Sequence, residues 1–98
     1  MEKITWSNGL RLLLLPVEGA LSASVGVWIE AGSRYEPAAA QGISHFVEHM
    51  LFKGTAARSA RDISEEMDML GGSLNAYTTQ ECTRYYAQTL AQNAPGAL

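Results

Sequence analysis

The segment His45-Phe46-Val47-Glu48-His49 constrains this chain more than any other part of it, because it holds both histidines of the 98 residues. Residues four apart on an α-helix project from one face, so the two imidazoles are close enough to share a metal ion. Glu48 lies on the same side of that helix, where its carboxylate can reach a water at the metal without being a ligand. The spacing therefore predicts a helix with a metal site along one side.

The same helix has an apolar stripe on its opposite side at about 100° per residue. We expect this stripe to pack against a sheet and the polar stripe to line a cleft. Lys53 and Gly54 are typical of a helix end, so we place the helix at about residues 41–53. The alternative is an ordinary amphipathic helix whose polar face happens to hold histidine and glutamate. The apolar stripe consists of Ile43, Phe46, Val47, Met50 and Leu51.

Length and composition limit the class of protein. A chain of 98 residues makes at most one small domain, and a hydrophobic content of 47% allows it a core. No apolar run is long enough for a membrane-spanning helix. A net charge of −3 argues against nucleic acid and against an anionic membrane as partners. Cys82 is the only cysteine, which excludes an internal disulfide and fits a reducing compartment.

Several segments have the pattern of β-strands. Asn8-Gly9 between two strand-like runs predicts a hairpin over residues 4–15. Residues 22–31 alternate between apolar and polar side chains, and residues 73–79 and 82–90 form two further candidate strands. The last strands follow a helix rather than alternating with helices. We therefore predict an α+β fold, a largely antiparallel sheet with helices packed on one face.

A second helix is predicted between the metal-site helix and the last two strands. Ser59 and Asp62 have the spacing of a capping box at its start. Ile63, Met67 and Leu70 mark its buried stripe, and the glycine pair 71–72 ends it. Residues 91–98 fit either the start of another helix or a loop.

Read together, these residues resemble the pitrilysin/insulinase family of zinc metallopeptidases, and within it the branch of mitochondrial processing peptidase and its bacterial relatives. The motif His45 to His49 is the inverted H-x-x-E-H form of a zinc-peptidase motif. The resemblance covers nearly the whole chain, in linked motifs that follow the family's order. These motifs are Asn8-Gly9-Leu10, Gly32-Ser33-Arg34-Tyr35-Glu36, the segment from His45 to Thr55, Gly71-Gly72-Ser73-Leu74-Asn75-Ala76-Tyr77-Thr78, and then Glu81, Thr83 and Tyr85.

The resemblance implies a role for five residues. His45 and His49 would bind Zn²⁺, and Glu48 would be the general base for the water that attacks a peptide carbonyl. Asn75 and Ala76 would hold an extended substrate beside the edge of the sheet, by β-augmentation. The alternative for Asn75 is a structural side chain that bonds to local backbone.

A complete catalytic zinc site needs three protein ligands. The resemblance places the third, a glutamate, beyond Leu98. Glu81 and Cys82 are the only other candidates near the end of the chain, and spacing alone gives them weak support. We therefore expect residues 1–98 to be a single partial domain, the leading part of the N-terminal metallopeptidase domain, and inactive alone.

The predicted function is zinc-dependent hydrolysis of extended or unfolded peptides by an endopeptidase like the processing peptidases. A second homologous domain or subunit would be its partner. One alternative is a non-catalytic structural or partner subunit of the same family, against which the intact motif counts. Another is a small metal- or peptide-binding module. The N-terminus has neither a secretory signal nor a transit-peptide pattern, and together with the resemblance this leads us to expect a cytoplasmic, bacterial protein.

Overall fold

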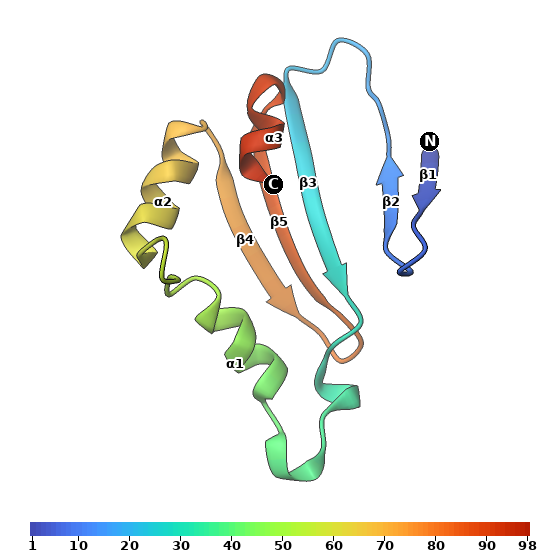
Figure 1. The fold of residues 1–98 in the computed structure, drawn as a ribbon, viewed down its shortest axis with the longest axis vertical. Coiled ribbons are helices and arrows are strands. Elements are labelled where there is room, and N and C mark those ends of the chain that lie inside the picture. The colour runs from blue at the N-terminus through green and yellow to red at the C-terminus, as the bar shows by residue number, and fades with distance from the viewer.

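The computed structural model describes residues 1–98, and its architecture confirms the predicted α+β fold (Figure 1). A two-stranded hairpin precedes a three-stranded antiparallel sheet of order β3-β5-β4. Three α-helices and three short 3-10 helices complete the chain. The strands are β1 (Glu2–Thr5), β2 (Arg11–Leu14), β3 (Ser22–Ile29), β4 (Ser73–Thr78) and β5 (Thr83–Leu90). The helices are α1 (Ile43–Met50), α2 (Ala60–Met69) and α3 (Ala94–Ala97), with 3-10 turns at Ser33–Tyr35, Ala38–Ala40 and Ala91–Asn93.

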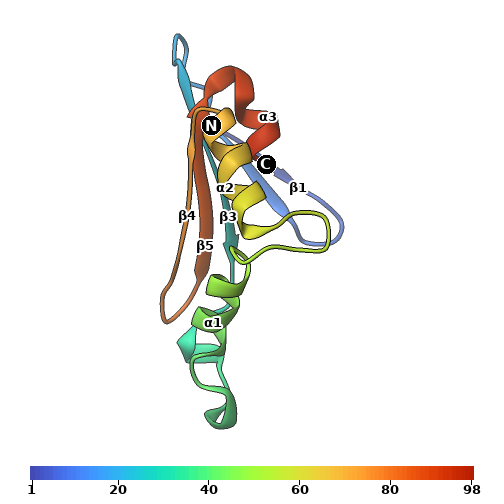
Figure 2. The ribbon, with the colours of Figure 1, turned by 90° about the vertical axis from the view of Figure 1, so that its left-hand side faces the viewer.

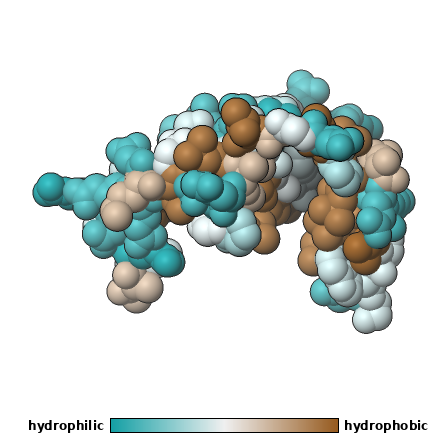
Figure 3. All heavy atoms as spheres, turned by 90° about the horizontal axis from the view of Figure 1, so that it is seen from above, coloured by the Kyte–Doolittle hydropathy of each residue, from teal (hydrophilic) through white to brown (hydrophobic).

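The N-terminal hairpin forms as predicted but stands apart from the main sheet. Its strands pair antiparallel, with Ile4 opposite Leu12, and Gly9 adopts a φ of 88° in the turn. A space-filling view shows a hollow between the hairpin and the rest of the molecule, with apolar atoms beside it (Figure 3). The leucine run from Leu12 to Leu15 has the pattern of a buried strand, but Leu13 and Leu15 are 61% and 71% exposed, so that expectation is wrong.

The main sheet has two different faces. All three helices lie on one face (Figure 2). On the other face, the guanidinium of Arg84 lies over the rings of Tyr77, Tyr86 and Trp28 at 4.3, 4.5 and 5.4 Å from their centroids. These contacts place a cation on the aromatic ring faces, where it is favoured. The core under the helices is small, since Ala87 is the only buried hydrophobic residue.

Helix α2 follows the sequence prediction closely. Ser59 and Asp62 form the reciprocal capping box at its start. At its end Gly71, with φ of 70°, donates to the Asp68 carbonyl, and Gly72 donates to that of Met67. This pair of bonds is the Schellman pattern, and it turns the chain directly into β4. Ile63, Met67 and Leu70 are the half-buried positions of the helix, as expected.

Helix α1 departs from the prediction in length and in orientation. It begins after Gly42, whose φ of 89° is not helical, and ends at Met50, so it is shorter than residues 41–53. The expected packing of its apolar stripe is wrong. Phe46 is 60% exposed and Leu51 is 53% exposed, whereas Glu48 is only 8% exposed. The helix instead turns Ser44 and Glu48 inward, its two least exposed positions, and Phe52 in the following turn is half-buried.

Residues 91–98, left open by the sequence, form a 3-10 turn followed by α3, which packs against β5 and β3. The helix-covered face thus meets α1 and α2 along β4, and α3 along β5 and β3. No helix in the structure has the length and apolarity needed to cross a membrane.

Candidate metal centre

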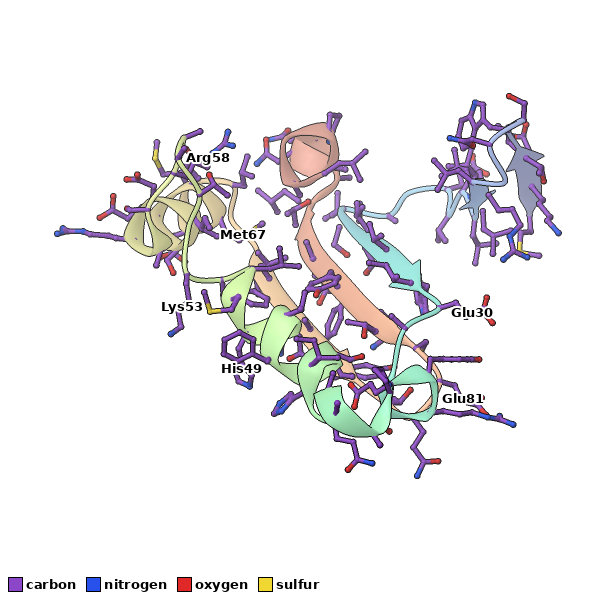
Figure 4. All side chains as sticks on the ribbon, turned by 60° about the horizontal axis from the view of Figure 1, so that its bottom comes forward. Glu30, His49, Lys53, Arg58, Met67 and Glu81 are labelled. Atoms are coloured by element: carbon purple, nitrogen blue, oxygen red, sulfur yellow. The ribbon has the colours of Figure 1, made fainter.

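The structure brings His45, Glu48 and His49 together on α1, as the motif predicts. The two histidine Nε2 atoms are 2.9 Å apart, and the rings meet edge to face with centroids 4.4 Å apart. One potential ligand atom from each of the three residues lies within 4.8 Å of the other two. His49 and Lys53 project from the side of α1 that faces away from β3 (Figure 4).

This donor set fits a zinc ion. Two imidazole nitrogens are ligands that Zn²⁺ takes in proteins, and the carboxylate beside them can accept a proton from a water at the metal. Tetrahedral Zn–N bonds of about 2.0–2.1 Å place two nitrogens about 3.3 Å apart, a few tenths of an ångström wider than the pair here. In this structure one imidazole nitrogen donates to the other, and metal binding would replace that hydrogen bond with two ligand bonds.

A hydrogen bond from the sheet holds the Glu48 side chain in place. Its Oε2 accepts a hydrogen bond from the Thr78 hydroxyl at the end of β4. Tyr85, on the same face of β5, has its pKa raised by burial and then by the negative charge of Glu48. A buried carboxylate needs such a donor, because desolvation without a hydrogen bond is costly. Thr78 and Tyr85 belong to motifs of the sequence, but nothing in their spacing assigned them this role.

Glu36 ties the start of α1 to the preceding loop. Its two carboxylate oxygens accept from the amides of Gly42 and Ser44, each at 2.8 Å. These bonds lower the pKa of Glu36, the Gly42 amide contributing most. Helix N-terminal amides lack partners within the helix, so a carboxylate there stabilises the first turn. Sequence reasoning missed this contact, because Glu36 lies outside the usual capping positions.

An open cavity of about 570 Å³ adjoins the metal site. It lies between the N-terminal end of α1 and the end of β4, and His45 and Thr78 form part of its wall. None of its eight lining residues is hydrophobic. The polar stripe of α1 was expected to line a cleft, and of its three metal-site residues only His45 lines this cavity. The apolar stripe of α1 lies on another side of the helix.

Asn75 and Ala76 lie in β4, which pairs only with β5 and is therefore an edge strand. The Asn75 side chain is exposed, and its Oδ1 accepts from the Ala76 amide at 2.9 Å. This is the local backbone bond that the structural alternative for Asn75 predicts.

Glu81 and Cys82 do not join the metal cluster. Glu81 forms an exposed ion pair with Arg34, with 2.7 Å between Oε1 and Nη1. Cys82 lies in the turn before β5, where its amide donates to the Thr79 hydroxyl. The structure therefore gives neither residue a place as a third ligand beside His45 and His49.

Comparison with known proteins agrees with this fold. A protease from Helicobacter pylori has a solved structure that matches with a TM-score of 0.89 at 33% identity, over 98% of this chain and 23% of that one. The chain is 47% identical over its full length to a protein of Bacillus subtilis (strain 168) named uncharacterized zinc protease YmxG, of which it covers 24%. It is 50% identical over 96% of its length to a protein of Arabidopsis thaliana named probable mitochondrial-processing peptidase subunit beta, of which it covers 18%.

These matches span about a quarter of each relative or less, while they cover nearly all of this chain. Two of the relatives are named as proteases and one as a processing-peptidase subunit, and the Bacillus protein is named for zinc. The donor set on α1 suits that metal. Residues 13–98 match the family described as insulinase (peptidase family M16), and the chain therefore belongs to that family.

Proposed function

We propose that this chain carries the metal-binding helix and the substrate-binding strand of a zinc-dependent endopeptidase that acts on extended or unfolded peptides. The observation that carries the proposal is Glu48, a carboxylate only 8% exposed and placed beside two imidazoles. Burying a charged group without a function or an ion pair is unfavourable, so such groups mark candidate functional sites.

His45 and His49 would hold the zinc ion, which supplies a water of lowered pKa and polarises the scissile carbonyl. Glu48 is on the same turn as His49 and would accept the proton of the attacking water. Thr78 donates to one carboxylate oxygen and leaves the other free for that proton. The hydroxyl also fixes the carboxylate on the sheet side of the site, which limits the orientations Glu48 can adopt.

The free edge of β4 would bind the substrate as an added antiparallel or parallel strand. Backbone pairing accepts any extended sequence, which suits unfolded polypeptides. Ala76 would pair with the substrate only after its amide is released from the Asn75 side chain, which bonds it now. We propose that Asn75 exchanges this bond for one to the substrate backbone.

We propose further that residues 1–98 form the leading part of a larger metallopeptidase domain, since they span about a quarter of their relatives. A glutamate elsewhere in the polypeptide would be the third protein ligand, and the 98 residues alone would not hydrolyse peptides. The Arabidopsis relative is named as a subunit, which supports a second homologous domain or subunit as the partner. A cytoplasmic, bacterial setting stays a prediction, to be tested by cell fractionation.

The test uses the longest natural polypeptide that contains this sequence. Glu48→Gln should keep stoichiometric zinc by elemental analysis and lose hydrolysis of a fluorogenic peptide, because the ligands remain and the base is gone. His45→Ala should lose both. Undiminished hydrolysis by Glu48→Gln would remove Glu48 from its role, and stoichiometric zinc in His45→Ala would place the metal elsewhere.

A further inference from the structure

The polar cavity beside His45 is larger than the metal site needs. It holds about 570 Å³, within the usual range for ligand sites, and lies at the Thr78 end of β4. A peptide paired along β4 would pass His45 and then reach this cavity. The cavity would therefore receive a side chain of the substrate close to the bond that is cut.

Three of the lining side chains have unused hydrogen-bonding capacity. Gln41 and Gln80 both line the cavity, one before α1 and one in the turn after β4, and Ser33 belongs to the 3-10 turn at Ser33–Tyr35. None of the three makes a side-chain hydrogen bond within the chain, whereas Thr79 and Thr78 use their hydroxyls internally. The free groups thus include two carboxamides, each of which can donate and accept.

Charge at the cavity disfavours ionised ligands of either sign. Glu36 is the one carboxylate in the lining, and its bonds to two helix amides keep it ionised, so it repels acidic side chains. Cationic side chains are disfavoured as well, because a divalent ion held by His45 would repel them. No lining residue is hydrophobic, so an apolar side chain would meet only the carbon atoms of polar residues.

We propose that this cavity is a specificity subsite for a neutral, hydrogen-bonding side chain of the substrate, such as a carboxamide, and that Gln41 and Gln80 determine the preference. The inference rests on the proposed peptidase function and specifies which substrates that site selects. Because the cavity is open, the selection is modest. One or two net hydrogen bonds correspond to a preference of about three- to tenfold over an apolar side chain of similar size.

The test compares two peptide series with the longest natural polypeptide that contains this chain, loaded with zinc. Each series has an alanine-rich sequence in which one Gln, or one Leu, is moved through every position. Binding is measured by fluorescence anisotropy on the Glu48→Gln variant, which separates affinity from cleavage. Cleavage of the same peptides is measured on the wild type by mass spectrometry.

We expect the Gln peptide to bind about three- to tenfold more tightly than the Leu peptide at one position only. The preference should vanish in the double variant Gln41→Ala/Gln80→Ala and persist in Gln92→Ala. Gln92 is a matched control because it is exposed and follows β5 at the opposite end of the sheet. Circular dichroism should show the same fold in all three proteins.

The outcomes separate the two proposals. Equal binding of Gln and Leu peptides at every position, or a preference that survives the double variant, overturns the subsite while cleavage still supports the peptidase. A Gln preference without cleavage by the wild type supports the subsite and overturns the peptidase. Absence of binding by every peptide overturns both.

Discussion

Helices α1 and α2 lie on the same face of one sheet but are positioned by different forces. In α2, the half-buried residues are Ile63, Met67 and Leu70, and the inward stripe is apolar. In α1, the inward stripe is led by Ser44 and Glu48, and the apolar residues face outward. An amphipathic helix normally buries its apolar side. The reversed orientation of α1 indicates that a polar contact with the sheet, rather than apolar burial, determines how it lies.

The two helices also begin differently. The start of α2 is capped from within its own sequence, where the Ser59 hydroxyl accepts from the Asp62 amide. The start of α1 is held by Glu36, from the loop before it. The start of α2 is therefore determined by its own residues, whereas the start of α1 depends on residues outside the helix. Four predictions test this contrast.

The largest effect is expected from Glu48→Met in the longest natural polypeptide containing the chain. Removing the general base should lower hydrolysis by at least about 10²-fold. The free energy of unfolding should fall by about 1–3 kcal/mol, because the Thr78 hydroxyl loses its acceptor and α1 loses the contact that orients it. Activity and chemical denaturation measured on one preparation provide the comparison. Unchanged stability would show that the carboxylate serves the site without positioning α1.

Met67→Ala should lower the free energy of unfolding by about 2 kcal/mol, the low end for a core methionine, because Met67 is only half-buried. Zinc stoichiometry should not change, since α2 is away from the metal cluster. Met69→Ala is the matched control on the same helix, because Met69 is 86% exposed and its loss should cost under about 0.5 kcal/mol. Equal losses for the two variants would mean that apolar burial does not position α2.

Ser59→Ala should destabilise the protein by about 1 kcal/mol, because the Asp62 amide loses its acceptor at the start of α2. Urea denaturation measures the change. Ser64→Ala, in the exposed middle of the same helix, should be close to neutral. If both serine variants behave alike, the local cap does not stabilise α2.

The smallest effect is the response to acid. Bonds from backbone amides hold the pKa of Glu36 and of Asp62 below its usual range, chiefly the amide of Gly42 for Glu36 and that of Ser59 for Asp62. A carboxyl whose pKa is lower in the folded state stabilises the fold above its unfolded pKa. That stability is lost as pH falls from about 4 through the folded value.

Unfolding free energy measured against pH should therefore decline in acid for the wild type. Glu36→Gln and Asp62→Asn should each flatten the decline and be less stable than the wild type at neutral pH. If Glu36→Gln left the curve unchanged, the carboxylate would not be what holds the start of α1.

Sequence patterns predicted most of the elements and the composition of the metal cluster. The hairpin turn at Gly9, the capping box of α2 and the glycine pair after it are local signals, and each forms as expected. The H-x-x-E-H spacing brought the three cluster residues together for the same reason, since helical geometry is local. Features that depend on residues close together in the sequence could therefore be predicted from it.

What could not be predicted depends on residues far apart in the chain. The orientation of α1 rests on a contact from Thr78 to Glu48, 30 residues away, and periodicity reports only which residues share a face. The Glu36 carboxylate reaches amides six and eight residues further along the chain, beyond the spacing of a local helix cap. The exposure of the leucine run in the hairpin reflects where the hairpin sits relative to the sheet, which no local pattern encodes.

Thr78 ends the same strand whose free edge is proposed to bind the substrate. The same strand would therefore position both the peptide and the carboxylate base that acts on it. If β4 shifts or bends relative to the rest of the molecule, the peptide and the Glu48 carboxylate would move with it, so the distance between them would change little. Such coupling would make the proposed arrangement of base and peptide tolerant of small motions in a sheet with so few buried residues.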